Sequence, residues 1–197
     1  MERSAVYRRA LAPIMLFAGL LGVLAAGGGI VFHLESTRAF GGLWLGTALV
    51  AIVGAFLIAR RQALKDHEPF WSPPTKRVAQ ALLPPLMVGL ILGIVMMACN
   101  LSDEQPMSKV VGMLWLPLGW VVLYGCALCA AGYFTPGGLK IFGWAFILGG
   151  CGLFALGIPD WPPRLYYAHS IMGFYFGVLH LAYGAYLYLT EKRENAA

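Results

Sequence analysis

Residues 11–34 read LAPIMLFAGLLGVLAAGGGIVFHL and include no Asp, Glu, Lys or Arg. Each residue of an α-helix advances the chain by 1.5 Å, so about 20 residues cross the roughly 30 Å hydrocarbon core of a bilayer. This stretch is therefore predicted to be a transmembrane helix. Five more apolar stretches of comparable length follow it. We expect six spans, at about residues 11–34, 41–59, 81–101, 108–133, 139–158 and 166–189.

The composition of the whole chain agrees with this prediction. Of its 197 residues, 59% are hydrophobic and only 12% are charged. A water-soluble domain of this composition would expose mostly hydrocarbon to solvent, which excludes that class. The predicted fold class is all-α: a single transmembrane domain, residues 1–197, in which six helices form three helical hairpins.

The basic residues predict the orientation in the membrane. If the N-terminus is cytoplasmic, eleven of the fourteen Lys and Arg residues lie on the cytoplasmic side and three lie outside. Short loops rich in positive charge stay in the cytoplasm, so both termini are predicted to be cytoplasmic. The cytoplasmic set is Arg3, Arg8, Arg9, Arg60, Arg61, Lys65, Lys76, Arg77, Lys140, Lys192 and Arg193, and the outer set is Arg38, Lys109 and Arg164.

The net charge of +5 follows from these same cations. They lie at the ends of spans, where they meet anionic lipid headgroups, and no basic stripe remains for a nucleic acid. The predicted partner is the lipid bilayer, and nucleic-acid binding is not expected.

The first span also imitates a secretory signal peptide, because Arg8 and Arg9 precede an apolar stretch that contains small residues. The apolar region of a signal peptide is about 7 to 15 residues long, which is shorter than residues 11–34. We therefore expect a retained membrane anchor.

Two of the hairpins share residues at one offset. Pro13, Trp44 and Gly54 match Pro84, Trp115 and Gly125, each of which lies 71 residues later in the chain. These matches predict a tandem hairpin repeat, residues 10–59 and 81–130, although apolar sequences also match by chance. A shift by a whole hairpin gives a parallel repeat, which differs from the inverted repeats typical of alternating-access transporters.

Glycines at helical spacing predict close packing between spans, because small residues let two backbones approach each other. Those of the sixth span share one face with two histidines, within about 80° at 100° per residue. The glycines expected at helix contacts are Gly89, Gly93, Gly143, Gly150, Gly157, Gly173, Gly177 and Gly184.

Three histidines are the candidate cofactor ligands, since an ionisable residue inside a membrane suggests function and imidazole can ligate haem iron or relay a proton. His33 and His169 are expected at the same outer end of the bundle, and His180 lies about 16 Å along the axis from His169. The alternative is a neutral histidine whose ring bonds to a backbone carbonyl or a tyrosine, which would satisfy His180 completely.

The cysteines do not predict a metal site. Cys126 and Cys129 form a CxxC inside the fourth span, but zinc usually takes four ligands and this pair supplies two. Small apolar packing residues explain them better. No catalytic residues are predicted, because no carboxylate pair, no nucleophile with a base and no phosphate-binding loop occurs.

The longest polar segment runs from Arg60 to Gln80 and contains three prolines, which forbid one continuous helix across it. Phe70 and Trp71 are expected at the level of the lipid headgroups, as in aromatic belts. We interpret the segment as an interfacial connection, and the alternative is a loop that binds a partner.

Three segments of the chain resemble a family of bacterial six-helix integral membrane proteins that has no established activity. They are Glu68-Pro-Phe-Trp, then Leu123-Tyr-Gly together with Gly-Trp-Ala-Phe from Gly143, and Phe176-Gly-Val-Leu-His-Leu-Ala-Tyr-Gly. With the layout of the spans, the resemblance covers most of the chain. It implies a multi-pass protein of the bacterial cytoplasmic (inner) membrane and implies nothing about a reaction.

Three functions from different classes remain open from the sequence. The first is a non-enzymatic interaction or accessory component without a cofactor, whose small-residue faces pack internally, against a partner membrane protein or in a homo-oligomer. The second is a haem-binding or redox membrane subunit that uses His33, His169 or His180. The third is a permease for a small neutral or apolar solute.

Overall fold

The computed structural model describes residues 3–34, 36–67, 69–99, 106–135, 138–156 and 165–194. Within these ranges the chain is helical and contains no β-strand. The elements are α1 (Arg3–Val31), α2 (Thr37–Lys65), α3 (Pro73–Cys99), α4 (Pro106–Ala131), α5 (Gly138–Ala155), α6 (Leu165–Met172), the π-helix η2 (Gly173–Val178) and α7 (Leu179–Glu194). Because α6, η2 and α7 follow one another without a break, they are together called helix six.

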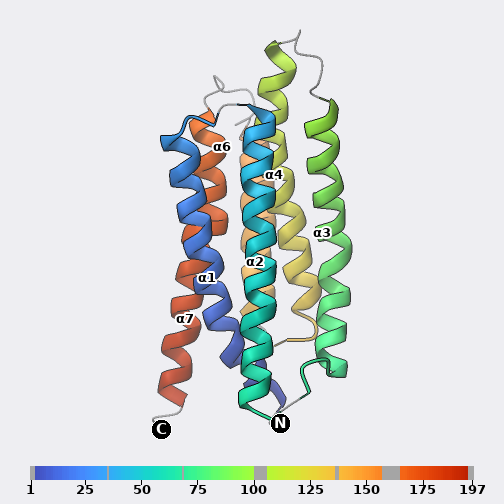
Figure 1. The fold of residues 1–197 in the computed structure, drawn as a ribbon, viewed down its shortest axis with the longest axis vertical. Helices are drawn as coiled ribbons and strands as arrows, with labels where there is room; N and C mark the ends of the chain where they lie inside the picture. The colour runs from blue at the N-terminus through green and yellow to red at the C-terminus, as the bar shows by residue number, and fades with distance from the viewer. Residues whose placement is uncertain are drawn as a thin grey trace.

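The helices stand side by side along the long axis of the molecule (Figure 1). α1 begins and α7 ends at the same end of the bundle, which is called the terminal end here (Figure 1). The connections from α2 to α3 and from α4 to α5 also lie at the terminal end. The connection from α1 to α2 lies at the opposite end.

The length and composition of the helices identify a multi-pass membrane protein. Five helices are long and apolar enough to cross a membrane, namely α1, α2, α3, α5 and the part of helix six from Tyr167 to Thr190. α4 adds the apolar stretch Trp115–Ala131 among the residues whose side chains are described. The prediction of an all-helical membrane bundle is confirmed.

Several helices extend beyond the predicted spans, most clearly around the polar segment at 60–80. α2 continues to Lys65 instead of ending near residue 59, and α3 begins at Pro73 instead of near residue 81. Arg and Lys are good helix formers, so a helix does not have to end where the hydrocarbon ends. Proline suits the first position of a helix, where its missing N–H costs no hydrogen bond. The irregular connection is therefore much shorter than the sequence predicts.

The N-terminus of α2 has a side-chain cap. The hydroxyl of Ser36 accepts a hydrogen bond from the backbone N–H of Ala39 at 3.0 Å. The first amides of a helix have no carbonyl partner within the helix, and a serine at this position satisfies one of them. This cap fixes where the chain enters α2.

Two clusters of buried side chains form the core. The cluster nearer the terminal end joins α1, α4, α5 and helix six, and it includes Ala12, Met15, Phe142, Phe146 and Leu187. The cluster nearer the opposite end joins α1, α2, α4 and helix six, and it includes Ala26, Phe40, Trp44, Leu116 and Trp120.

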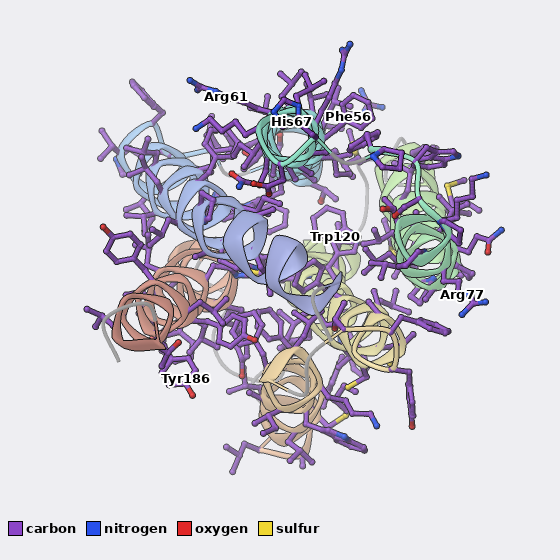
Figure 2. All side chains as sticks on the ribbon, turned by 90° about the horizontal axis from the view of Figure 1, so that it is seen from below. Phe56, Arg61, His67, Arg77, Trp120 and Tyr186 are labelled. Atoms are coloured by element: carbon purple, nitrogen blue, oxygen red, sulfur yellow. The ribbon has the colours of Figure 1, made fainter. Side chains whose placement is uncertain are left out.

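α2 is a peripheral helix. In its most apolar stretch of 18 residues only 6% of the residues are buried within the protein, compared with 11% in α3, 33% in α1 and 39% in helix six. It packs mainly against α1, while α1 also packs along helix six, and α4 packs against α3 and α5. In the view along the bundle, α2 lies at the rim (Figure 2).

The two predicted repeat hairpins have different surroundings. Trp44 of α2 is 4% exposed, whereas Trp115 of α4 is 47% exposed. Gly54 lies against the Phe17 ring of α1, whereas Gly125 lies against the Gly143 backbone of α5. The residues that match in sequence therefore make different contacts, and the duplication itself stays a prediction.

Candidate functional site: two buried histidines on helix six

Helix six carries the two buried histidines of the described part of the chain. His169 lies on α6 and His180 near the start of α7, and each is 1% exposed. They are separated by η2, the π-helical segment. A buried polar side chain inside a membrane needs hydrogen-bond partners from the protein, because lipid provides none.

His169 connects helix six to α2 and to the end of α1. The indole Nε1–H of Trp44 donates a hydrogen bond to Nδ1 of His169 at 3.3 Å. Nε2 of His169 lies 3.5 Å from the carbonyl oxygen of Leu34. An indole can only donate and a carbonyl can only accept, so a neutral ring must carry its proton on Nε2.

His180 has partners on both ring nitrogens as well. Nδ1 lies 3.0 Å from the carbonyl oxygen of Tyr175, and Nε2 lies 2.9 Å from the hydroxyl of Tyr124. The carbonyl can only accept, so the neutral ring carries its proton on Nδ1 and the Tyr124 hydroxyl donates to Nε2. These are the carbonyl and tyrosine partners that the sequence predicts for a neutral packed histidine. The two histidines thus hold opposite tautomers.

Aromatic rings enclose His180. The imidazole packs edge-on against Phe142 and Phe146, with ring centroids at 5.2 and 5.5 Å, and lies parallel to Phe176 with centroids at 6.0 Å. The Tyr124 ring approaches with its centroid at 5.4 Å. These contacts hold the ring in one orientation.

His33 differs from the other two histidines. Its side chain is exposed, and it occupies a turn after α1 with a φ of 48°. The sequence places it at the same end as His169, and the structure agrees, since His169 approaches the carbonyl of the next residue, Leu34. The buried network therefore uses the backbone beside His33.

The predicted glycine stripe of helix six packs against α1. A Cβ atom added to Gly173 would lie 2.6 Å from Cβ of Ala26, and one added to Gly177 would lie 2.8 Å from Cγ2 of Val23. A Cβ atom added to Gly184 would lie 2.9 Å from Cγ of Leu16. Only glycine allows the two helices to approach this closely.

The predicted glycines on the other helices pack against α4. A Cβ atom added to Gly143 would lie 2.8 Å from the backbone nitrogen of Cys129, and one added to Gly150 would lie 2.7 Å from Cγ2 of Val122. Gly93 lies under the Trp120 ring, and the carbonyl of Gly89 accepts a hydrogen bond from Trp120 Nε1 at 2.8 Å. Figure 2 shows Trp120 directed toward the interior of the bundle. Gly157 lies outside the described residues.

Sequence reasoning missed the α1 side of this packing. Gly19, Gly22 and Gly29 face Leu181, the backbone of Phe176 and the ring of His169, respectively. These positions fall within about 80° of each other at 100° per residue, a spacing that could have identified the face. The hydrogen-bonding roles of Trp44 and Tyr124 were missed because sequence spacing does not show which helices are neighbours.

A second group of glycines has open space beside it. A Cβ atom added to Gly42 or Gly46 of α2 would meet no atom within 4 Å, and the same holds for Gly27, Gly28 and Gly152. Gly42 and Gly46 are four residues apart, so they share one face of α2. That face points away from the bundle.

Three of the four cysteines, Cys126, Cys129 and Cys151, have described side chains. Cys126 and Cys151 are exposed, and Cys129 Sγ lies 3.6 Å from the carbonyl of Lys140. Among the described residues, no three His, Cys, Asp or Glu side chains are placed to hold a metal ion. No protein-family model, curated protein or solved structure matches the chain.

Proposed function

We propose that the protein is a non-enzymatic interaction component of a bacterial inner membrane, which binds a transmembrane helix of another membrane protein through α2. In this proposal both termini lie in the cytoplasm. The distribution of Lys and Arg supports this orientation, and the resemblance of three segments to a bacterial membrane family supports the location.

The observation that carries the proposal is the outward glycine pair on the peripheral helix α2. Gly42 and Gly46 have the small-xxx-small spacing at which membrane helices associate closely, and nothing within the described protein fills the space beside them. Leu49, Val50 and Val53 continue the same exposed face toward the terminal end. The surface that Gly42, Gly46, Leu49, Val50 and Val53 form together is called the α2 face.

The opposite side of α2 holds the helix on the bundle. Phe40 and Trp44 are buried, and the Phe40 ring stacks on Trp120 with centroids 6.3 Å apart. Gly42 and Gly46 are each two residues from Trp44, which is about 200° around the helix. The bundle therefore supports α2 from behind while its α2 face stays available to a neighbour.

The interior of the bundle favours this proposal over the haem subunit and the permease. Both ring nitrogens of His169 and of His180 already have protein partners. Among the described side chains, no buried nitrogen or oxygen lacks a hydrogen-bond partner. A ligand would have to displace these bonds, whereas the α2 face requires no rearrangement.

Photo-crosslinking in native membranes tests the proposal. A benzophenone amino acid replaces Val53 on the α2 face or, as a matched control, Leu148, which is 65% exposed on α5. We expect a discrete crosslinked product only from residue 53. A product of twice the 21.3 kDa chain mass would identify a homo-oligomer.

Glycine variants decide whether that product depends on the α2 face. Gly46→Leu should abolish the crosslink from residue 53, because the side chain blocks close approach of a second backbone. Gly152→Leu, where space is also open, should leave it unchanged. Equal crosslinking from residues 53 and 148, or a product that persists in Gly46→Leu, would contradict the proposal.

A further inference from the structure

The π-helix η2 lies directly before His180 and changes how backbone groups are paired. At its end the amide of Leu179 donates to the carbonyl of Phe174, five residues back. In the α-helix that follows, amides pair four residues back, which directs the amide of His180 to the carbonyl of Phe176. The carbonyl between these two, that of Tyr175, is passed over at the change of register.

An unpaired carbonyl is costly at this position. The Tyr175 residue is 6% exposed within the protein and lies inside a membrane span, where no water is at hand. The His180 side chain reaches back to this oxygen, with Nδ1 at 3.0 Å. The imidazole thus lies where the missing amide partner is needed.

We infer that His180 is a positioning residue that caps the carbonyl released by η2 and thereby fixes the register of helix six. Its second nitrogen, bonded to the Tyr124 hydroxyl at 2.9 Å, ties this register to α4. The role is independent of the proposed function of the α2 face, since it concerns other helices.

Fixing the register has a consequence for the packing of α7. A π-helical turn inserts one residue relative to an α-helix, so it rotates the following residues by about 100°. With η2 present, Gly184 faces Leu16 of α1, and Leu187 is buried. Without it, the larger side chain of Tyr183 would come to the place of Gly184, where even one added carbon would lie 2.9 Å from Leu16.

Deletion of one residue from η2 distinguishes the capping of the Tyr175 carbonyl by His180 from ordinary side-chain packing. Removing Val178, whose side chain is 50% exposed, takes out the inserted residue and returns the segment to α-helical pairing with both flanking faces preserved. The Tyr175 carbonyl then receives a backbone amide, and His180 loses that acceptor. If this deletion does not fold, removal of Phe174, also 50% exposed, tests the same point.

Stability in detergent is measured for His180→Phe in the wild type and in the deletion. In the wild type the substitution removes two hydrogen bonds, and we expect each to shift the unfolding equilibrium about 3- to 20-fold, the range of one membrane hydrogen bond. In the deletion the shift should be clearly smaller. Tyr124→Phe serves as the matched control, with the same effect in both backgrounds. Equal effects of His180→Phe in both backgrounds would overturn the inference.

The tautomer gives a readout that packing alone would not change. Nitrogen NMR of histidine-labelled protein, assigned by loss of the signal in His180→Phe, should show His180 protonated on Nδ1 and His169 protonated on Nε2. Deletion of Val178 should shift the proton of His180 away from Nδ1. Protonation on Nε2 in the wild type, or a tautomer that the deletion leaves unchanged, would refute the role.

Discussion

Three aromatic side chains form hydrogen bonds between the helices of this bundle. Trp44 joins α2 to helix six, Trp120 joins α4 to α3, and Tyr124 joins α4 to helix six. Each is an aromatic residue with a single donor, so most of its surface is compatible with an apolar interior. In a membrane such bonds stabilise a protein only modestly, by about 0.6 kcal/mol on average.

The two tryptophans at matching repeat positions provide a test at this scale. Trp44→Phe should lower the free energy of unfolding by about 0.6 to 1.7 kcal/mol, because it removes the donor to His169 and keeps an aromatic ring. Trp115→Phe is the control, since Trp115 is exposed and packs against Phe154. Unfolding of detergent-solubilised protein by SDS measures both, and equal losses would show that the hydrogen bond is not what matters.

Sequence reasoning reached part of the histidine site. The burial of His169 and His180, and the carbonyl and tyrosine partners of His180, agree with the need to satisfy a buried ring. The shared face predicted at a constant 100° per residue does not hold across η2, because the glycines of helix six contact α1 whereas His180 contacts α4 and α5. The identity of Trp44 and Tyr124 as partners does not follow from the sequence, because it depends on which helices become neighbours. The π-helical turn was also not foreseen, since periodicity arguments assume a constant rotation per residue.

Glycines determine the packing at the scale of helices. α1 and helix six meet through glycines on both sides, so their backbones come close along much of their length. α4 and α5 use the same device, with Gly125 and Gly143 facing each other. Glycine spacing in the sequence identified such faces on α3, α5 and helix six, but could not say that α1 completes the contact.

Alanine substitutions at two glycines of α1 separate the effect of close helix packing on stability from the effect of helix propensity. Gly22→Ala places a methyl group against the backbone of Phe176 and should destabilise the protein by about 1 to 3 kcal/mol, partly offset by the better helix propensity of alanine. Gly27→Ala meets open space and should be neutral or slightly stabilising.

Thermal unfolding in detergent, followed by circular dichroism, measures the two variants side by side. The starting helix content should be the same in both. A Gly22→Ala protein as stable as Gly27→Ala would show that α1 and helix six do not need their close approach.

At the scale of the whole molecule, charge and hydropathy predict the fold class, because a bilayer restricts which segments can span it and which can form loops. The helical class and the long apolar helices followed from them. The helix ends did not, because the charged turns of α2 and α3 resemble a loop in the sequence although they are helical. Residues such as Arg164, at one predicted outer loop, lie outside the described residues.

The orientation of the whole molecule has a direct test. His33 and His67 are both exposed turn residues with positive φ, at opposite ends of the bundle. In a variant without the native cysteines, His33→Cys should react with a membrane-impermeant maleimide on intact spheroplasts. His67→Cys should react only after the membrane is permeabilised. The reverse pattern would place both termini outside.

The length of α2 has a consequence for how the protein responds to its membrane. Its 29 residues correspond to about 43 Å of helix, but only the uncharged stretch 39–59, about 31 Å long, has to match the roughly 30 Å of a hydrocarbon core. Few residues of its most apolar stretch are buried by bundle neighbours, so we expect lipid to contact much of its surface. The uncharged stretch fits a bilayer of ordinary thickness with little tilt, and a thinner bilayer requires more tilt. Because α1 and Trp44 support only one side of α2, we expect bilayer thickness to change the tilt of α2, and with it the angle at which the α2 face would meet the proposed partner helix.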